Sequence, residues 1–306
     1  MGNNAVVDAA RRALGPVGIA LPASLTSPID IDGQREAVVR LDSAGYRTVW
    51  TNETVGGKDA LVQLAVLLAA TRRTVFGTGI ANVWAREPET LHGAASVLAQ
   101  AYPGRFVLGI GGGYPQQAAA TGREFGSPLG KMRDYLDRMD GPTMPPTPDA
   151  PYPRIIAANG PKMLALAGEL ADGALPAGGP PAFTAQARQV LGPDKLLVVG
   201  LTMVPGSDPA RARQGARERV SAGLAQPWFA AAVARLGFSE QEIAEVSDRL
   251  VDTMIAHGEP AAIAAKAGEH LAAGADHVAL LPPIGTDFAT GVDQAEWLAP
   301  ALRDLH

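Results

Sequence analysis

The chain has 306 residues, which is enough for one large α/β domain or two small ones. Its apolar content of 47% and charged content of 19% allow a sizeable core and argue against global disorder. A formal net charge of −5 argues against a general nucleic-acid binder, which needs a basic surface. The lack of cysteine excludes disulfides, thiolate nucleophiles and cysteine-ligated zinc, and it fits a reducing cytoplasm, where we expect the protein.

Eight short apolar segments alternate with helical segments along the chain. Strands are expected at residues 16–21, 46–51, 74–80, 105–110, 154–158, 172–177, 195–204 and 276–281. Helices are expected at residues 5–14, 30–44, 58–71, 87–100, 129–139, 159–170, 181–191, 208–223, 260–273 and 294–305. Residues 225–250 exceed what one strand-helix repeat needs, so we expect a helical insertion there, near the seventh strand. Within it, Ser239 and Glu242 have capping-box spacing, which predicts a helix start.

This alternation predicts a single (β/α)8 barrel, or TIM barrel, that spans residues 1–306, and a doubly wound open sheet is the alternative. No apolar run approaches the roughly 20 residues of a membrane span. Residues 1–8 lack the basic and apolar segments of a secretory signal. We therefore expect a protein that acts on a small molecule and has neither a membrane nor a nucleic-acid partner.

The loop after the fourth expected strand contains Gly111, Gly112, Gly113 and Tyr114. It does not fit a dinucleotide-binding fingerprint, because Tyr114 replaces the last small residue and no helix is expected to start at once. The glycines are explained either by a turn that needs positive φ or by backbone amides that approach an anionic ligand. Because chemistry lies at the carboxyl ends of strands in parallel α/β folds, this loop is a candidate site.

A second candidate loop, Asn159, Gly160, Pro161 and Lys162, lies where the fifth expected strand passes into a helix. Free amides at a helix start bind phosphate, and Lys162 adds a positive charge. The alternative is an ordinary helix start with Asn159 as the cap and Pro161 in the first turn. In a barrel this loop lies beside the triple-glycine loop, so together they favour a phosphorylated ligand.

Single residues near the ends of the second and third strands are the remaining candidates. Glu53 is a possible general acid or base, or else a solvated loop carboxylate. Asn82 and Trp84 lie in the loop after the third strand, where Trp84 is expected to wall a ligand, whereas Trp50 is expected in the core. His277 is expected to be structural. No pair of histidines has metal-ligand spacing, so no metal site is predicted.

These segments together make the chain resemble the bacterial luciferase-like oxidoreductases, and most of all the branch that uses the deazaflavin coenzyme F420. The resemblance is carried by residues 77–86 (Gly-Thr-Gly-Ile-Ala-Asn-Val-Trp-Ala-Arg), 104–111 (Gly-Arg-Phe-Val-Leu-Gly-Ile-Gly), 159–163, 171–173 and 273–278. It implies a barrel with an insertion near the seventh strand and a bulge with a non-prolyl cis peptide at Gly79–Ile80, over which the deazaflavin ring lies. It also implies that the phosphate and acidic tail lie along residues 111–114 and 159–162, and that the protein forms a homodimer.

Two positions depart from the pattern of the family. A catalytic histidine that several members have after the second strand is absent, since residues 50–53 read Trp-Thr-Asn-Glu. Gly112 and Gly113 stand where close relatives often have a Ser-His pair. The leading hypothesis is an oxidoreductase that moves hydride between coenzyme F420 and a small organic substrate, with Glu53 as proton partner. The alternatives are an FMN-dependent monooxygenase on the same barrel and a non-catalytic protein that binds the coenzyme.

Overall fold

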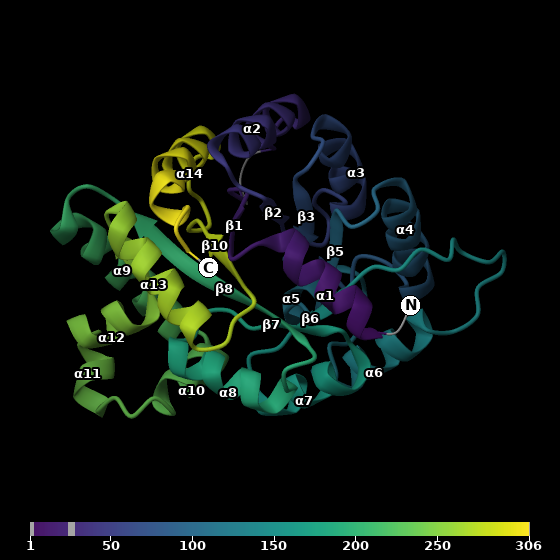
Figure 1. Cartoon of the computed structure of the whole chain (residues 1–306). Coiled ribbons are helices and arrows are strands. Elements are labelled where there is room, and N and C mark those ends of the chain that lie inside the picture. The colour runs from purple at the N-terminus through teal and green to yellow at the C-terminus, as the bar shows by residue number, and fades with distance from the viewer. Residues whose placement is uncertain (1–2, 24–27, 306) are drawn as a thin grey trace.

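The computed structural model describes residues 3–23 and 28–305, and in these ranges eight parallel strands form a barrel (Figure 1). The barrel strands are β1 (Val17–Ala20), β2 (Thr48–Thr51), β3 (Val75–Thr78), β5 (Phe106–Gly111), β6 (Arg154–Ala157), β7 (Gly173–Leu175), β8 (Leu196–Pro205) and β10 (His277–Leu281). Neighbours along the chain pair in parallel, and β10 pairs with both β8 and β1, which closes the sheet. The predicted (β/α)8 barrel is confirmed, and the open sheet is wrong.

Two further short strands extend the sheet. The strand β4 (Ala81–Asn82) follows β3 and pairs with the last residues of β5. The strand β9 (Ala256–Gly258) pairs with the end of β8, where Met203 lies opposite Ala256. The sequence gives no signal for β9, because three residues are too short to show a strand period.

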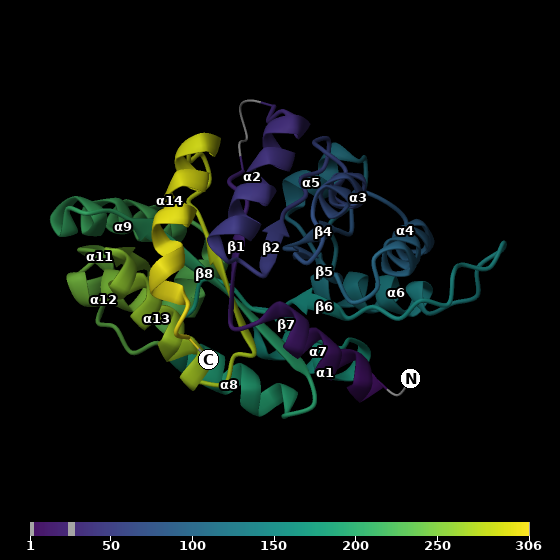
Figure 2. The same cartoon turned by 45° about the horizontal axis from the view of Figure 1, so that its top comes forward.

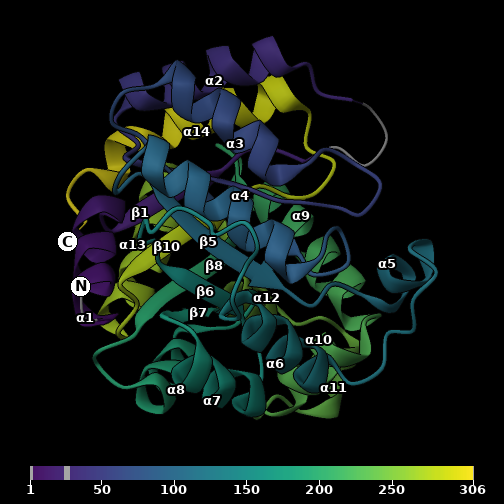
Figure 3. The ribbon, with the colours of Figure 1, turned by 90° about the vertical axis from the view of Figure 1, so that its right-hand side faces the viewer.

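Helices surround the barrel in chain order, and neighbouring helices pack side by side (Figures 2 and 3). They are α1 (Asn3–Leu14), α2 (Ile31–Ala44), α3 (Ala60–Ala70), α4 (Pro88–Ala101), α5 (Pro115–Ala120), α6 (Pro128–Met139), α7 (Pro161–Leu170), α8 (Pro181–Leu191), α9 (Pro209–Leu224), α10 (Pro227–Ala234), α11 (Glu240–Ala244), α12 (Asp248–Met254), α13 (Pro260–Ala272) and α14 (Phe288–Leu302). Several begin at an aspartate whose carboxylate accepts a first-turn amide, as Asp30 and Asp59 do.

The stretch predicted as a helical insertion contains α10, α11 and the first residues of α12, and these helices lie beside α9 (Figure 1). These helices share an apolar cluster with α9, in which Val220 and Val251 are both fully buried. Ser239 and Glu242 form the expected capping box, and α11 begins there. The insertion therefore has a small core of its own, which is separate from the interior of the barrel.

Two expectations about helix starts are wrong. A helix does follow Tyr114 at once, because α5 begins at Pro115 and the Gln117 side chain accepts the Tyr114 amide over 2.9 Å. The last helix begins at Phe288, ahead of residue 294, because the Asp287 carboxylate accepts the Thr290 amide. Both starts depend on a proline or a side-chain cap, which hydrophobic periodicity does not report.

The barrel interior is filled by alternate strand residues, and α1 closes its amino end with Val7, Ala10 and Leu14. Trp50 is the largest interior side chain and only 1% of its surface is exposed, so its predicted core position is confirmed. Its indole lies against Gly77, where an added Cβ would stand 2.2 Å from Trp50 Cζ3. The absence of a side chain at residue 77 therefore makes room for Trp50.

His277 holds the Trp50 indole in place, as its predicted structural role requires. Trp50 Nε1 donates to His277 Nε2 over 3.0 Å, and His277 Nδ1 lies 2.7 Å from the Gly15 carbonyl oxygen. The first contact needs an unprotonated Nε2, and the second needs a proton on Nδ1. The neutral tautomer with its proton on Nδ1 therefore fits both partners. Burial lowers the pKa of His277 to about 4.

We expect acid to destabilise the protein through this histidine. The folded pKa lies below the unfolded value of about 6.5, so the unfolded chain binds more protons between those two values. Stability is fully present above pH 6.5 and falls toward pH 4, by up to about 1.4 kcal/mol per pH unit for this group. Urea unfolding of the wild type and His277→Gln over this range checks it, and equal slopes in the two proteins would contradict it. Burial also lowers the pKa of His270 to about 4, so His270→Gln should remove a further part of the slope.

Candidate functional site

The predicted site residues lie at the carboxyl ends of β2, β3, β4, β5 and β6. These strands are neighbours in the barrel, so the loops after them meet at one end. The peptide bond between Gly79 and Ile80 is cis, at the position that the family resemblance implies. The Gly79 amide donates to the Thr51 carbonyl over 2.6 Å, and the Ile80 carbonyl accepts the Glu53 amide over 3.0 Å. The bulge between β3 and β4 is thus held by the end of β2.

Gly111 lets β5 approach this bulge closely. A Cβ at residue 111 would stand 2.5 Å from Ile80 Cγ1, and a Cβ at Gly109 would stand 2.1 Å from the Thr78 carbonyl oxygen. Thr78 Oγ1 also donates to the Gly109 carbonyl over 2.7 Å. Glycine at both positions is therefore required by the packing of β3 against β5.

Glu53 is buried, with 1% of its side chain exposed, and protein donors surround its carboxylate. Its oxygens accept the amides of Ala60 over 3.0 Å and of Asn82 over 2.8 Å. Both terminal nitrogens of Arg86 donate to the same carboxylate, in a two-pronged ion pair. The carboxylate therefore joins the start of α3 to the loop after β4. The role of Glu53 in proton transfer stays a prediction, while its observed contacts are structural.

Arg86 extends this network. It also pairs with the Asp59 carboxylate over 2.7 Å, and its carbonyl oxygen accepts the Tyr135 hydroxyl over 2.9 Å. Desolvation acts to lower the pKa of Arg86, but the two acidic partners outweigh it and raise the pKa. The sequence gives no signal for the pair between Arg86 and Glu53, because the partners are 33 positions apart and meet only in the barrel.

Asn82 and Trp84 hold the triple-glycine loop through hydrogen bonds. The Asn82 side chain accepts the Trp84 amide over 3.0 Å and donates to Gln117 Oε1 over 3.0 Å. Trp84 Nε1 donates to the Gly112 carbonyl over 2.7 Å. Only 3% of Trp84 is exposed, and its ring lies beside Phe125. Its predicted contact with a ligand stays a prediction, while its observed contacts are with the loop and its surroundings.

The glycines of this loop serve different purposes. Gly113 has φ +60°, and a Cβ there would stand 2.5 Å from Gln117 Oε1, so the fold itself requires glycine. Gly112 has no atom within 4 Å of the place where its Cβ would be. The protein therefore leaves the space beside Gly112 open, and a ligand can approach the backbone there. Tyr114 is 52% exposed at the end of the loop.

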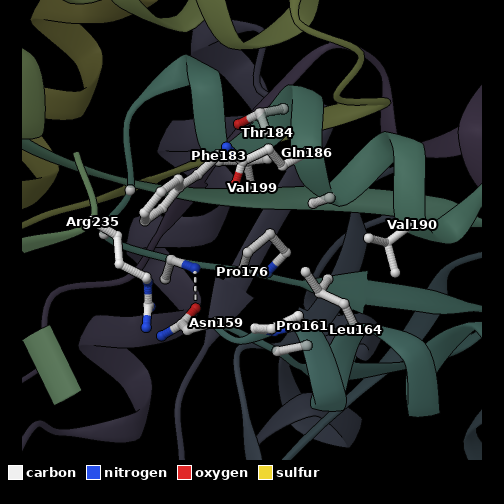
Figure 4. Close-up of a pocket in the computed structure, with 15 residues that line it drawn as sticks. Asn159, Pro161, Leu164, Pro176, Phe183, Thr184, Gln186, Val190, Val199 and Arg235 are labelled. Carbon is white, nitrogen blue, oxygen red and sulfur yellow. Dashed lines mark hydrogen bonds between the residues drawn. The ribbon is translucent and has the colours of Figure 1, made fainter. Parts of the chain in front are cut away.

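The second candidate loop borders a cavity of about 210 Å³ beside β7 and α8 (Figure 4). The cap of α7 is Gly160, with no side-chain bond, so the expected Asn159 cap is wrong. The Asn159 side-chain oxygen Oδ1 instead accepts the Ala177 amide over 2.8 Å. The first amides of α7 thus keep no side-chain cap, which suits an anion.

Two cations lie near this helix start. Lys162 is exposed in the first turn of α7, and Arg235 reaches the cavity from the segment that follows α10 (Figure 4). Among residues 3–23 and 28–305, neither side chain has an acidic partner within 4 Å. Arg235 was not predicted, since it is 73 positions beyond Lys162 and only the fold brings it to the cavity.

Other kinds of site find no support in the described part of the chain. No group of three or more histidine, aspartate or glutamate side chains there is placed to hold a metal ion. No helix within residues 3–23 and 28–305 has the length and apolarity needed to cross a membrane.

Comparison with known proteins supports the family resemblance. The sequence profile of the family described as luciferase-like monooxygenase matches residues 16–277. A Mycobacterium tuberculosis protein named a putative coenzyme F420-dependent oxidoreductase is 31% identical over an alignment of 173 residues, and the match covers 46% of this chain and 50% of that protein. The 5,10-methylenetetrahydromethanopterin reductase of Archaeoglobus fulgidus is 27% identical over an alignment of 152 residues, and the match covers 44% of this chain and 46% of that protein. The chain thus spans about half the length of the curated relatives it matches.

Solved structures share the fold over nearly the whole chain. An F420-dependent secondary alcohol dehydrogenase in complex with an F420-acetone adduct aligns with a TM-score of 0.71 and 18% identity, and covers 95% of this chain and 100% of that one. The F420-dependent tetrahydromethanopterin reductase from Methanopyrus kandleri aligns with a TM-score of 0.68 and 16% identity, and covers 94% of this chain and 100% of that one. At this identity the alignments establish the barrel fold.

We expect Glu53→Gln to destabilise the protein by about 3 kcal/mol, because it leaves the Arg86 charge buried without its main partner. Asp59→Asn is the matched control, since it removes the exposed partner of Arg86 but keeps the helix cap, and should cost less than about 1 kcal/mol. Urea unfolding measures both. A wild-type free energy of unfolding for Glu53→Gln would contradict the structural role.

Proposed function

The chain belongs to the luciferase-like monooxygenase family, and on this premise we propose that it is an oxidoreductase that uses coenzyme F420. The proposed reaction moves hydride between the deazaflavin and a small organic substrate. The proteins named above favour F420, since three of them carry that coenzyme in their names. When bound, the deazaflavin supplies the hydride chemistry, and the protein supplies binding and orientation.

The observation that carries this proposal is a pair of loops after neighbouring strands, each of which offers an accessible backbone to an anionic group. The open side of Gly112 and the uncapped start of α7 lie at the same barrel end, beside the cations Lys162 and Arg235. Coenzyme F420 has a phosphate and an acidic tail, which match amides and cations in this arrangement. We place the ring at Gly79–Ile80 and the tail along residues 111–114 and 159–162.

The ion pair between Glu53 and Arg86 positions the backbone of the proposed coenzyme site. The pair of Glu53 and Arg86 holds the bulge through the Asn82 amide, and the Asn82 side chain continues the network to Gln117, which binds the Tyr114 amide. Because these contacts hold the backbone in place, a ligand that binds there has less conformational entropy to remove. The proton partner of the reaction and the homodimer implied by the resemblance both stay predictions.

We expect saturable binding of coenzyme F420, measured by quenching of intrinsic tryptophan fluorescence, and weaker binding of FMN. Gly112→Ala should weaken F420 binding about tenfold, since its Cβ enters space that the protein leaves open for the ligand. The control is Gly168→Ala on α7, whose Cβ would also meet no atom. Both variants should unfold at wild-type temperatures or above. Tight binding of FMN in place of F420 would move the protein to the monooxygenase alternative.

We also expect Lys162→Met and Arg235→Met each to weaken F420 binding several-fold at low salt, with the difference shrinking as salt screens the charges. Arg72→Met is the control, because Arg72 is an exposed cation between α3 and β3, at the opposite barrel end. Titrations at two salt concentrations measure the effect. An equal loss of affinity in all three variants would show that net charge, and not this site, attracts the coenzyme.

A further inference from the structure

A second cavity, of about 760 Å³, lies at the carboxyl ends of β1 and β2, between α2 and α3. Its lining combines apolar side chains with a few polar ones. The members used below are Ile29, Ile31, Val62, Asn52, Lys58 and Gln63. The loops assigned to the coenzyme above do not line this cavity.

The polar wall of the cavity contains two linked glutamine amides. Gln34 Nε2 donates to the Ile29 carbonyl oxygen over 3.0 Å, and Gln63 Nε2 donates to Gln34 Oε1. The Ile29 carbonyl can only accept, so it fixes the orientation of the Gln34 amide and, through it, that of Gln63. Gln63 Oε1 is then left as an acceptor, and no donor reaches it from the residues that the structure describes.

This free acceptor is buried, since Gln63 is only 5% exposed and lines the cavity. A buried carbonyl without a donor is costly, and nearly all such groups in folded proteins are paired. A hydroxyl or N–H group of a ligand in the cavity would satisfy it. The cavity therefore selects a molecule with a hydrogen-bond donor at its inner end.

Lys58 supplies the opposite kind of partner. Its ammonium lies 3.4 Å from Asn52 Oδ1, and desolvation lowers its pKa although the Glu53 charge opposes that effect. The nearby carboxylates are committed elsewhere, because Arg86 pairs with both Glu53 and Asp59. Lys58 is thus available to an anionic group of a ligand.

The cavity is next to the place proposed for the deazaflavin ring. Asn52 lines the cavity and directly precedes Glu53, whose amide donates to the Ile80 carbonyl over 3.0 Å. On the other side of Asn52, the Thr51 carbonyl accepts the Gly79 amide over 2.6 Å. The cavity wall and the bulge are therefore joined through one strand end.

We infer that this cavity holds the organic substrate, and that the substrate is a small, mainly apolar hydroxy acid. Its hydroxyl donates to Gln63 Oε1, its carboxylate accepts from Lys58, and its apolar body lies against Ile29 and Val62. That this ligand is the substrate rests on the proposed function. The binding site itself rests on the cavity, the unpaired acceptor and the cation.

The test uses the full chain without coenzyme and three aromatic probes in titrations followed by ligand-observed NMR. 4-Hydroxyphenylacetate has both groups, phenylacetate lacks the hydroxyl, and 4-hydroxyphenylethanol lacks the carboxylate. We expect the first probe to bind about fivefold to tenfold more tightly than either of the others, the effect of one buried hydrogen bond or ion pair. Gln63→Leu should abolish the preference over phenylacetate, and Lys58→Met the preference over 4-hydroxyphenylethanol.

Because Gln63→Leu also removes the donor to Gln34, a second variant tests the site without touching the amides. Val62→Trp, at a side chain that is 64% exposed, should fill the cavity and block all three probes. Val97→Trp is its control, since Val97 is 54% exposed on α4 and does not line the cavity. Thermal unfolding confirms that each variant is folded.

Equal affinity for the three probes, or unchanged binding to Val62→Trp, would overturn the inference. So would absence of binding in a protein that light scattering shows to be a dimer, because a second copy would then cover the cavity. A separate F420 titration distinguishes the two proposals. F420 binding without probe binding overturns only the substrate cavity. Selective probe binding without F420 binding supports the cavity and overturns the proposed function.

Discussion

The buried ion pair between Glu53 and Arg86 is the contact on which the candidate site depends. A carboxylate with so little exposure is stable only if donors surround it, and here two backbone amides and one guanidinium do so. Those donors come from the start of α3 and from both ends of the loop after β4. The Glu53 carboxylate therefore connects the start of α3 to the loop after β4. Through Asn82, the same network reaches Gln117 and the triple-glycine loop.

The inward-facing side chains of the barrel are large in the layer below the site and small in the layer at the site. Trp50 fills the interior, and His277 and the missing side chain of Gly77 keep it there. One step toward the carboxyl end, the inward positions are small, as at Gly79 and Gly111. The large side chain gives the barrel a packed floor, and the small ones leave backbone surface at its mouth. This division explains why stability and ligand binding depend on different residues of the same strands.

In the order of the barrel strands, the bulge at Gly79–Ile80 after β3 lies between the two cavities. The cavity beside β7 has cations and helix amides at its edge, which suit the acidic tail of a coenzyme. The cavity beside β1 and β2 has an unpaired amide carbonyl, a lysine and apolar walls, which suit a hydroxy acid. If the ring lies at the bulge, as proposed, the coenzyme tail and the substrate would lie on different sides of it. The insertion contributes Arg235, which follows α10, to the lining of the cavity beside β7.

The sequence alone determined the barrel, because each of its eight strands has an apolar run and most of its helices have a regular apolar face. It also determined where the loops of the site lie, since those loops follow directly from strand ends. The tertiary structure decided what the loop residues do. Glu53 was predicted to be a possible general acid or base, but its partner Arg86, 33 positions away, was not predicted. Trp84 was predicted to face a ligand, and its hydrogen bond to the Gly112 carbonyl was not foreseen. Such pairings depend on which strands become neighbours, and periodicity along one segment carries no information about distant segments. The unpaired oxygen of Gln63 arises in the same way, from three groups that meet only when α2 packs on α3.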